Sequence, residues 1–403
     1  MNIIQKVNSR VFQFVLTTGQ KAMNYGVPET ISGAGCVKLL PSRIKADGID
    51  NVLLVAGKTV SRNGLIDSFV EAMDHESIKY TLFDGAAPDP SIENVEDCRK
   101  AYLDNKCQAI VAFGGGSSMD CAKIAAARIA NPNKSVEAMG GALKVSKKIA
   151  RFYAVPTTAG TGSETTIAAV VTNKQEHHKY AISDPKLLPH VAVLDPELTV
   201  GLPASVTAMT GMDALTHAVE AYTNKFGSDF AYDNAKKAVK LIFENLEEAY
   251  NHGDNLEARN NMLMGSFYAG VAFTRNFVGY VHAVGHALGG MYGIPHGQAM
   301  AAIMPKALRK YGASIHSRLA DLAEIAGIGS IEGKSEKEKA LAFIEEVEAM
   351  NERMGIPRYF EKIKEEDIDK LASFAYKEGN PMYPVPQMWT KDEFAGFYRS
   401  LMG

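Results

Sequence analysis

The sequence predicts an α/β nucleotide-binding domain followed by an all-helical metal-binding domain. Short apolar runs alternate with helical patterns through the first half, whereas strand signals fade after Asp195-Pro196 and helical periodicity dominates from Pro203 onward. Strands that alternate with helices indicate parallel β-structure with helical crossovers. We therefore predict an α/β domain over residues 1–198 and an all-helical domain over residues 199–403.

The composition is typical of a soluble globular enzyme with a large core. The 403 residues are 46% hydrophobic and 22% charged, with a net charge of -3. That charge provides no field that attracts nucleic acid or an anionic membrane. The most apolar window, near residues 262–273, is shorter than the ~18 residues of a membrane-spanning helix. The four cysteines include no C-x-x-C pair. We predict a cytoplasmic protein without nucleic-acid or membrane partners.

In the first half, short apolar runs predict the strands and the segments between them predict helices. The helices are expected from about Arg62, from about Ile92, and from the third strand to about Ala130. The predicted strands are Val52–Val55, Tyr80–Phe83, Ala109–Phe113, Phe152–Val155, Ala168–Thr172 and Val191–Leu194.

The third predicted strand runs directly into a glycine-rich turn, Gly114–Asp120, with the sequence GGGSSMD. Glycines let backbone amides approach a ligand closely, and the helix that follows points its positive end at an anion. Ser117 and Asp120 also have the spacing of a capping box. The turn fits a pyrophosphate, but a plain glycine turn between strand and helix is an alternative. The G-x-G-x-x-G fingerprint is not matched, because Met119 occupies the third glycine position.

A second polar glycine loop, Pro156–Glu164, follows the predicted strand Phe152–Val155. Its hydroxyl groups and glycines are dense enough to line a cofactor, although a surface loop has the same composition. Both interpretations stay open at this point.

Helical periodicity fills the second half of the chain. A later helix is expected to begin at the capping box formed by Ser335 and Glu338 and to end near Gly355. The other predicted helices are Ala204–Tyr222, Ala231–Tyr250, Leu256–Phe273 and Ala299–Lys310.

Five side chains of this second half carry the most specific signal. Asp213 and His217 are four residues apart, as are His282 and His286, so each pair lies on one face of a helix; His296 follows. Four of the five could enclose one divalent cation with a carboxylate oxygen and three imidazole nitrogens, a set that suits Fe²⁺, Zn²⁺ or Mn²⁺. Taken singly, each histidine is more simply an ordinary surface or core residue. The apolar residues around the cluster favour neutral imidazole, the form that binds a metal.

In their order and spacing, these motifs resemble those of the iron-containing (group III) alcohol dehydrogenases over nearly the whole chain. The matching segments are Gly114–Asp120, Pro156–Glu164, Gly211–His217 and Gly279–Gly297. The resemblance implies the dehydroquinate synthase-like fold of that family, with an α/β nucleotide domain and a helical metal domain. It also implies an NAD(P)(H)-linked alcohol dehydrogenase or aldehyde reductase that acts on a small primary alcohol or aldehyde. A homodimer or larger homo-oligomer is implied as well.

The resemblance also implies roles for individual residues. His286 would lie near the metal and the nicotinamide without ligating, and Phe273 would line the substrate pocket. Lys179 would reach the cofactor ribose. The ligands of Fe²⁺ (or Zn²⁺) would be Asp213, His217, His282 and His296. The pyrophosphate region would be held by Gly115, Gly116, Ser117 and Asp120, with Thr157, Thr158 and Thr161 nearby.

The chain departs from the family pattern at the adenosine end of the cofactor site. NAD-preferring relatives often carry Asp after the first strand of this domain, where Gly57 stands here. A carboxylate binds the ribose hydroxyls and repels a 2′-phosphate. Glycine removes that repulsion, and Lys58 and Arg62 lie close in sequence, although both could be ordinary solvated charges. We predict that NADP(H) is accepted, alongside or in preference to NAD(H).

A second departure concerns Arg275 and Asn276, which precede the histidine segment. They either face the substrate, which would favour polar or acidic groups, or pack at the domain surface. The sequence therefore does not identify the physiological substrate.

The predicted chemistry is hydride transfer between an alcohol carbon and C4 of nicotinamide, with the substrate oxygen on the metal. His286 is expected to relay the proton or to position the nicotinamide. The alternatives are a glycerol or diol dehydrogenase or another polar-substrate reductase on the same scaffold, a dehydroquinate-synthase-like lyase, a metal hydrolase without redox cofactor, and a noncatalytic nucleotide-binding module. The apolar metal segments argue against the lyase, and the glycine loop argues against the hydrolase.

Overall fold

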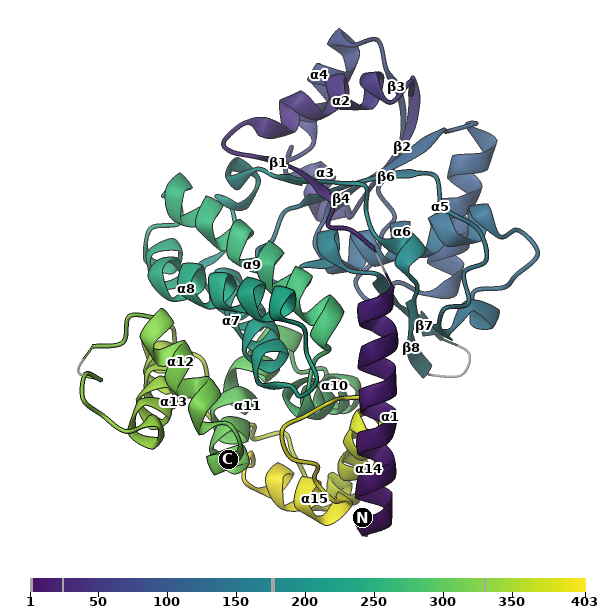
Figure 1. Cartoon of the computed structure of the whole chain (residues 1–403). Helices are drawn as coiled ribbons and strands as arrows, with labels where there is room; N and C mark the ends of the chain where they lie inside the picture. The colour runs from purple at the N-terminus through teal and green to yellow at the C-terminus, as the bar shows by residue number, and fades with distance from the viewer. Residues whose placement is uncertain (1–2, 24, 175–177, 330) are drawn as a thin grey trace. The chain divides into compact units, whose positions relative to one another are not determined.

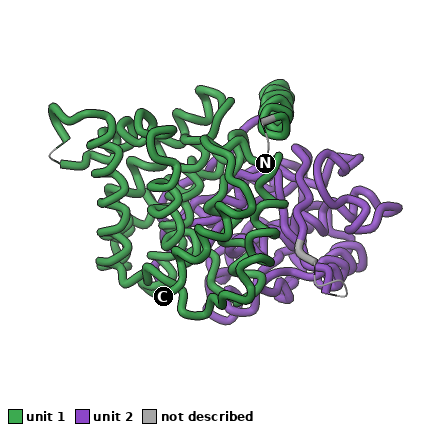
Figure 2. The backbone as a smooth tube through the Cα atoms, turned by 90° about the horizontal axis from the view of Figure 1, so that it is seen from below, with its two compact units in different colours: residues 1–24, 202–403 green, residues 25–201 purple. Residues whose placement is uncertain are grey.

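The computed structural model describes residues 3–23, 25–174, 178–329 and 331–403, without the side chains of Ile3, His178 and Lys179. The chain forms two compact units, one of residues 25–201 and one of residues 1–24 with 202–403 (Figure 2). The predicted boundary between residues 198 and 199 lies close to the observed one. The first 24 residues, however, group with the helical unit and not with the α/β unit.

Polar side chains explain why the N-terminal helix α1 (Ile3–Ala22) belongs to the helical unit. Arg10 donates to the carbonyl oxygens of Val385 and Pro386, and Gln13 donates to those of Pro381 and Tyr383. The apolar residues of α1 lie on its exposed face, namely Ile4, Val7, Val11, Phe14 and Val15. An apolar face at helical spacing predicts burial of that face, so the sequence pattern does not show that α1 is attached through its polar side chains.

The α/β unit is built on a six-stranded sheet whose neighbouring strands are all parallel (Figure 1). Across the sheet the order is β1 (Glu29–Ser32), β9 (Val191–Leu194), β6 (Arg151–Pro156), β4 (Ala109–Gly114), β2 (Asn51–Ala56) and β3 (Lys79–Phe83). Five of these are the predicted parallel strands, and β1 was not predicted. The fold class predicted for this half is confirmed.

Helices bury both faces of this sheet. On one face, Leu53 and Ile110 pack in a cluster with residues of α5 (Ile92–Asp104) and α6 (Gly116–Ala130). On the other face, Val52 and Val111 pack with residues of α2 (Leu40–Ala46) and α4 (Asp67–His75). Burial on both sides explains why β4, and β2 after its first residue Asn51, are apolar.

One sequence prediction for this unit was wrong in detail, and one confirmed strand lies in a second sheet. One helix was expected to begin at about Arg62, but the structure has two helices in this region. α3 (Lys58–Arg62) ends at that residue, and α4 starts at Asp67. Gly64, with φ of 70°, forms the turn between them. The predicted strand Ala168–Thr172 exists as β7 (Ala168–Asn173), but it lies in a separate sheet of order β5 (Gly141–Ala142), β8 (His178–Ser183), β7.

The second unit contains only helices among its described elements. They are α1, α7 (Ala204–Thr223), α8 (Asp229–Asn251), α9 (Leu256–Asn276), α10 (Tyr280–Tyr292), α11 (His296–Tyr311), α12 (His316–Ile325), α13 (Glu336–Arg353), α14 (Ile368–Gly379) and α15 (Lys391–Arg399). α7 packs against α8, α9 and α11, and α10 packs against α11 and α14 (Figure 1). The predicted capping box of Ser335 and Glu338 is confirmed at the start of α13. In the part of the chain that the structure describes, no helix has the length and apolarity needed to cross a bilayer.

Candidate functional site

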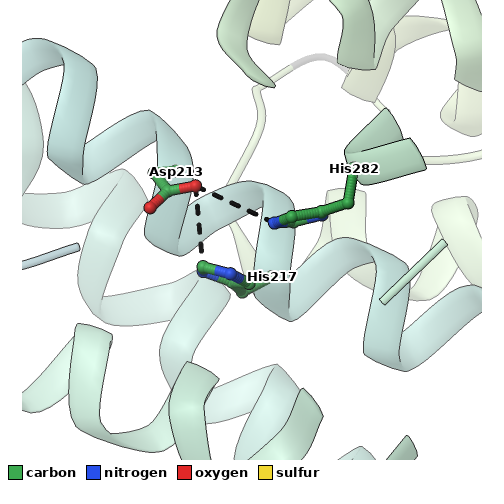
Figure 3. Close-up of side chains that lie close together, drawn as sticks. All are labelled: Asp213, His217 and His282. Atoms are coloured by element: carbon green, nitrogen blue, oxygen red, sulfur yellow. Dashed lines mark ion pairs between the residues drawn. The ribbon is translucent and has the colours of Figure 1, made fainter. Parts of the chain in front are cut away.

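The helical unit brings together three side chains that are distant in the sequence. Asp213 and His217 lie one turn apart on α7, and His282 comes from the first turn of α10 (Figure 3). The Oδ1 atom of Asp213 is 4.0 Å from Nδ1 of His217 and 3.9 Å from Nε2 of His282. One ligand atom from each residue lies within 4.8 Å of the others. The arrangement leaves room for one ion between two helices.

The polar atoms of this cluster are the strongest indication that a cation belongs there. Oδ1 of Asp213, Nδ1 of His217 and Nε2 of His282 are all buried, and none makes a hydrogen bond to another described residue. A buried polar atom without a partner costs about 1–3 kcal/mol, so three in one place require an explanation. A divalent cation would satisfy all three, because a carboxylate and two imidazoles are hard-to-borderline ligands of Fe²⁺ and Zn²⁺.

The protonation states also fit a metal. Burial lowers the pKa of His217 to about 3, and it lowers the pKa of His282 well below its usual value. Burial alone would raise the pKa of Asp213, but the neighbouring histidines hold it below its usual range. Neutral imidazoles and an ionised carboxylate are the forms that bind a divalent cation.

His296 approaches the same carboxylate from the start of α11. Its Nε2 atom is 3.3 Å from Oδ1 of Asp213, and its side chain is 43% exposed, whereas those of His217 and His282 are buried. Tetrahedral ligands about 2.1 Å from an ion lie roughly 3.4 Å apart. The predicted fourth ligand is therefore already at ligand spacing from Asp213.

His286, the fifth residue of the predicted cluster, lies one turn beyond His282 on α10 and is 44% exposed. Its ring stacks on that of His296, with a centroid separation of 5.2 Å. Its Nδ1 is 2.7 Å from Oε1 of Glu378 on α14, and the same oxygen accepts a hydrogen bond from the Tyr383 hydroxyl. His286 therefore borders the cluster while its own Nδ1 is held by a carboxylate.

Phe273, predicted to line the substrate pocket, stacks on the imidazole of His217 at 4.2 Å between ring centroids. Arg275 and Asn276, the two residues of that segment considered for the substrate, contact protein groups. Asn276 is buried, donates to the Ala221 carbonyl and accepts from the Ser228 amide, while the Arg275 guanidinium lies over the Phe230 ring. Packing at the domain surface was the alternative to facing the substrate, but Asn276 is buried inside the helical unit.

The predicted nucleotide loops meet at one edge of the parallel sheet. β2, β4 and β6 are neighbours, and their carboxyl ends lead into Gly57, Gly115 and Thr157 respectively. Ligands of open α/β sheets bind at this edge. α6 begins directly at the glycine turn and has no side-chain cap, so the amides of its first turn lack partners within the helix, as an anion site requires. The sheet thus brings Gly57 and both loops to the same edge.

The two loops pack closely. A Cβ on Gly115 would lie 3.3 Å from Oγ1 of Thr158, and one on Gly116 would lie 3.0 Å from Cγ2 of Thr161. Larger residues at either position would push the second loop away from the first. The glycines therefore serve loop packing as well as close approach of a ligand.

The predicted capping box at this turn was wrong. α6 begins at Gly116 with Gly115 as its N-cap, and no side chain caps it, so Ser117 lies within the first turn. The Asp120 carboxylate instead accepts hydrogen bonds from the Val170 amide and the Ser163 hydroxyl. Asp120 is thus bonded to the end of the second loop and to the strand that follows it. Lys179 was also predicted in this site; its backbone lies in β8, and its side chain falls outside the described residues.

Sequence analysis missed three charged residues that organise these sites. Glu220 contacts His282, Glu378 contacts His286, and the buried Lys123 donates to the segment Ser163–Ala168. Glu220 had a detectable signal, since it lies three residues after His217 on the same face of α7. Glu378 and Lys123 are far in sequence from the groups that they contact, so spacing gave no signal for them.

Comparison with known proteins agrees with this arrangement. A model described as iron-containing alcohol dehydrogenase matches residues 28–196, and one described as the C-terminal part of the Fe-containing alcohol dehydrogenase family matches residues 207–402. Alcohol dehydrogenase 4 of Schizosaccharomyces pombe is 34% identical and aligns with 96% of this chain and 91% of its own length. The 1,3-propanediol dehydrogenase of Klebsiella pneumoniae is 35% identical, with 94% and 98% covered.

Solved structures show the same likeness in three dimensions. The crystal structure of a 1,3-propanediol oxidoreductase superposes with a TM-score of 0.90 at 34% identity, covering 94% of this chain and 99% of the other.

Proposed function

The chain belongs to the iron-containing alcohol dehydrogenase family, and we propose that Asp213, His217, His282 and His296 hold its metal ion. It is an oxidoreductase that acts on CH–OH groups, with a divalent metal and NAD(P)(H) as cofactors. The observation that carries the ligand assignment is the set of three buried, unsatisfied ligand atoms around one point.

We assign separate roles to the residues around that point. When bound, the metal polarises the substrate oxygen and the nicotinamide gives or takes the hydride. His286 moves the proton: Glu378 accepts from its Nδ1–H, which leaves Nε2 to accept a proton from the alcohol or to return it to the nascent alkoxide. Phe273 covers the ring of His217 and presents an apolar wall to the substrate.

On the α/β unit, we propose that the first-turn amides of α6 and the glycines at positions 115 and 116 bind the cofactor pyrophosphate, together with Ser117. Thr157, Thr158 and Thr161 line the neighbouring loop, and Asp120 supports the site through its bonds to Val170 and Ser163. Lys179 stays assigned to the cofactor ribose by the resemblance. These roles are tested by cofactor affinity in single variants.

We propose a small primary alcohol or aldehyde as the substrate. The side chains of Arg275 and Asn276 are engaged within the protein, which removes the reason to expect an acidic substrate. A diol is the second candidate, because one relative 35% identical to this chain is a 1,3-propanediol dehydrogenase. Initial rates on small aldehydes, hydroxyaldehydes and the matching alcohols, each measured with both cofactors, decide between the two. Turnover of none of them would contradict the proposal.

Removing the metal is expected to abolish turnover, since polarisation of the substrate oxygen contributes several kcal/mol. Protein treated with a chelator and dialysed should regain activity with Fe²⁺ or Zn²⁺, of which Zn²⁺ should bind more tightly. The measurements are elemental analysis and the rate of NAD(P)H oxidation. Full activity in protein shown to be metal-free would contradict a metal-dependent reaction.

Replacing Gly57 by aspartate is expected to shift the cofactor preference from NADPH toward NADH by at least ~10-fold in relative kcat/KM, or about 1.4 kcal/mol. Gly57 is the N-cap of α3 with φ of -85°, a conformation that aspartate adopts without strain. Gly57→Ala is the matched control, because it adds only the Cβ, which would lie 3.3 Å from the Ala86 carbonyl oxygen. An equal shift in both variants would contradict a charge effect at the 2′-phosphate.

We also propose a cytoplasmic location and a homo-oligomer. All four cysteines are buried and free, as is usual in a reducing compartment. The oligomer rests on the family resemblance alone, and light scattering on the metal-loaded protein measures it.

A further inference from the structure

The carboxylate of Glu220 lies directly behind the candidate metal centre. Glu220 follows Asp213 and His217 on the same face of α7, and its residue is 3% exposed. Its Oε2 atom is 2.6 Å from Nδ1 of His282, on the side of the ring opposite to Nε2. It thus touches a candidate ligand without facing the ion.

The same carboxylate caps the N-terminus of α10. It accepts hydrogen bonds from the amides of Gly279 and Val281, both 2.7 Å long. The first amides of a helix have no partner within the helix, and Gly279, the N-cap of α10, has no side chain to supply one. A negative charge is favourable at this end of the helix dipole. Glu220 therefore fixes the position of α10 relative to α7 and, with it, the position of His282.

Gly279 is what makes this approach possible. A Cβ at this position would lie 2.8 Å from Oε1 of Glu220 and 3.1 Å from its Cδ. The backbone of Gly279 has φ of -133°, which any residue adopts, so the requirement for glycine here is one of space. Any larger residue would displace the carboxylate.

These contacts determine which ring nitrogen of His282 is available to bind a metal ion. The two oxygens of the Glu220 carboxyl accept backbone amides, and Oε2 also faces Nδ1 of His282, so this arrangement favours the tautomer that carries its proton on Nδ1. Nε2 then keeps its lone pair, and Nε2 is the buried atom without a hydrogen-bond partner among the described residues, 3.9 Å from Oδ1 of Asp213. We propose that Glu220 is a positioning residue for the metal centre: it sets the tautomer and the orientation of His282 and so prearranges the ligands before an ion binds.

This inference rests on the proposed metal centre, and its test begins with metal affinity. Glu220→Gln presents an amide NH₂ to a site that contains three donors, so at least one donor loses its acceptor. Loss of a partner behind a ligand typically costs 10- to 100-fold in metal affinity. We expect a loss of about that size for Zn²⁺ and Fe²⁺, measured on the full-length apoprotein by competition with a chromogenic chelator.

Gly279→Ala is a second, independent perturbation that keeps every ligand and every charge. It should weaken metal binding because its Cβ pushes the Glu220 carboxylate away. Gly290→Ala is the matched control on the same helix, since a Cβ at Gly290 meets nothing within 4 Å. It should bind metal as the wild type does.

Two further readouts separate positioning from general stability. In apoprotein labelled with ¹⁵N-histidine, the wild-type His282 ring should show a protonated Nδ1 and an unprotonated Nε2, and Glu220→Gln should show a mixture or the reverse. Glu378→Gln should leave metal affinity unchanged while it lowers kcat, because Glu378 contacts His286 and not a candidate ligand.

The outcomes distinguish the two proposals. Failure of the wild-type protein to bind any divalent metal would overturn the metal centre itself. Tight binding by the wild type together with equal affinity in Glu220→Gln and Gly279→Ala, and an unchanged tautomer, would overturn the role of Glu220 alone.

Discussion

His282→Ala is expected to remove the bound metal and to lower kcat/KM by at least ~10³-fold, the size of a loss of several kcal/mol in transition-state stabilisation. His282 is the candidate ligand that joins α10 to the pair on α7, and its ring stacks on His217 at 4.5 Å. Without it, the pair on α7 keeps only the half-exposed His296 of α11 as a further candidate ligand. The measurements are metal content of the purified protein and steady-state rates with both cofactors.

His252→Ala is the control for this variant. His252 lies just after α8 in the same unit, is 64% exposed in its side chain and pairs with Glu248 at the surface. An exposed pair of this kind contributes little to stability, so metal content and rates should match the wild type. Normal metal content and full activity in His282→Ala would contradict the ligand assignment.

Lys123→Met is expected to destabilise the α/β unit by at least about 1–3 kcal/mol, the cost of leaving a buried hydrogen-bond acceptor without its donor. Lys123 is 0% exposed, and its ammonium lies 2.6 Å and 2.8 Å from the carbonyl oxygens of Ser163 and Thr166 and 2.8 Å from the Thr166 hydroxyl. Burial lowers its pKa to about 8, while Asp120 and Glu164 oppose that shift, so it stays protonated at neutral pH. Methionine fills the space of the stem and leaves these acceptors unsatisfied.

Calorimetry of the full chain with and without NADPH measures this effect. The unfolding transition of the α/β unit should move to lower temperature. Cofactor affinity should also fall, because Lys123 holds the end of the second glycine loop against α6. Lys147→Met, at an exposed lysine of the same unit, should change neither quantity. Unchanged thermal stability in Lys123→Met would show that the buried ammonium contributes no net stabilisation.

Local pattern determined much of this protein. Continuous apolar runs identified the central strands, because a sheet buried on both faces requires them. Glycines after β4 predicted a turn that suits a phosphate, and spacings of four residues predicted that Asp213 and His217, and likewise His282 and His286, share one face of a helix. Each of these features is encoded within about ten neighbouring residues.

Tertiary structure decided what those features contact. Spacing could not show that α10 packs near α7, or that Glu220 accepts a hydrogen bond from His282, sixty-two residues later. It also could not show that the Asp120 carboxylate accepts a hydrogen bond from the Val170 amide and does not cap its own helix. It also could not assign the first 24 residues to the helical unit, because α1 is attached by polar side chains and exposes its apolar ones. Periodicity records which face of an element is buried; the partner of a buried polar group depends on the packing of distant elements, which only the folded chain defines.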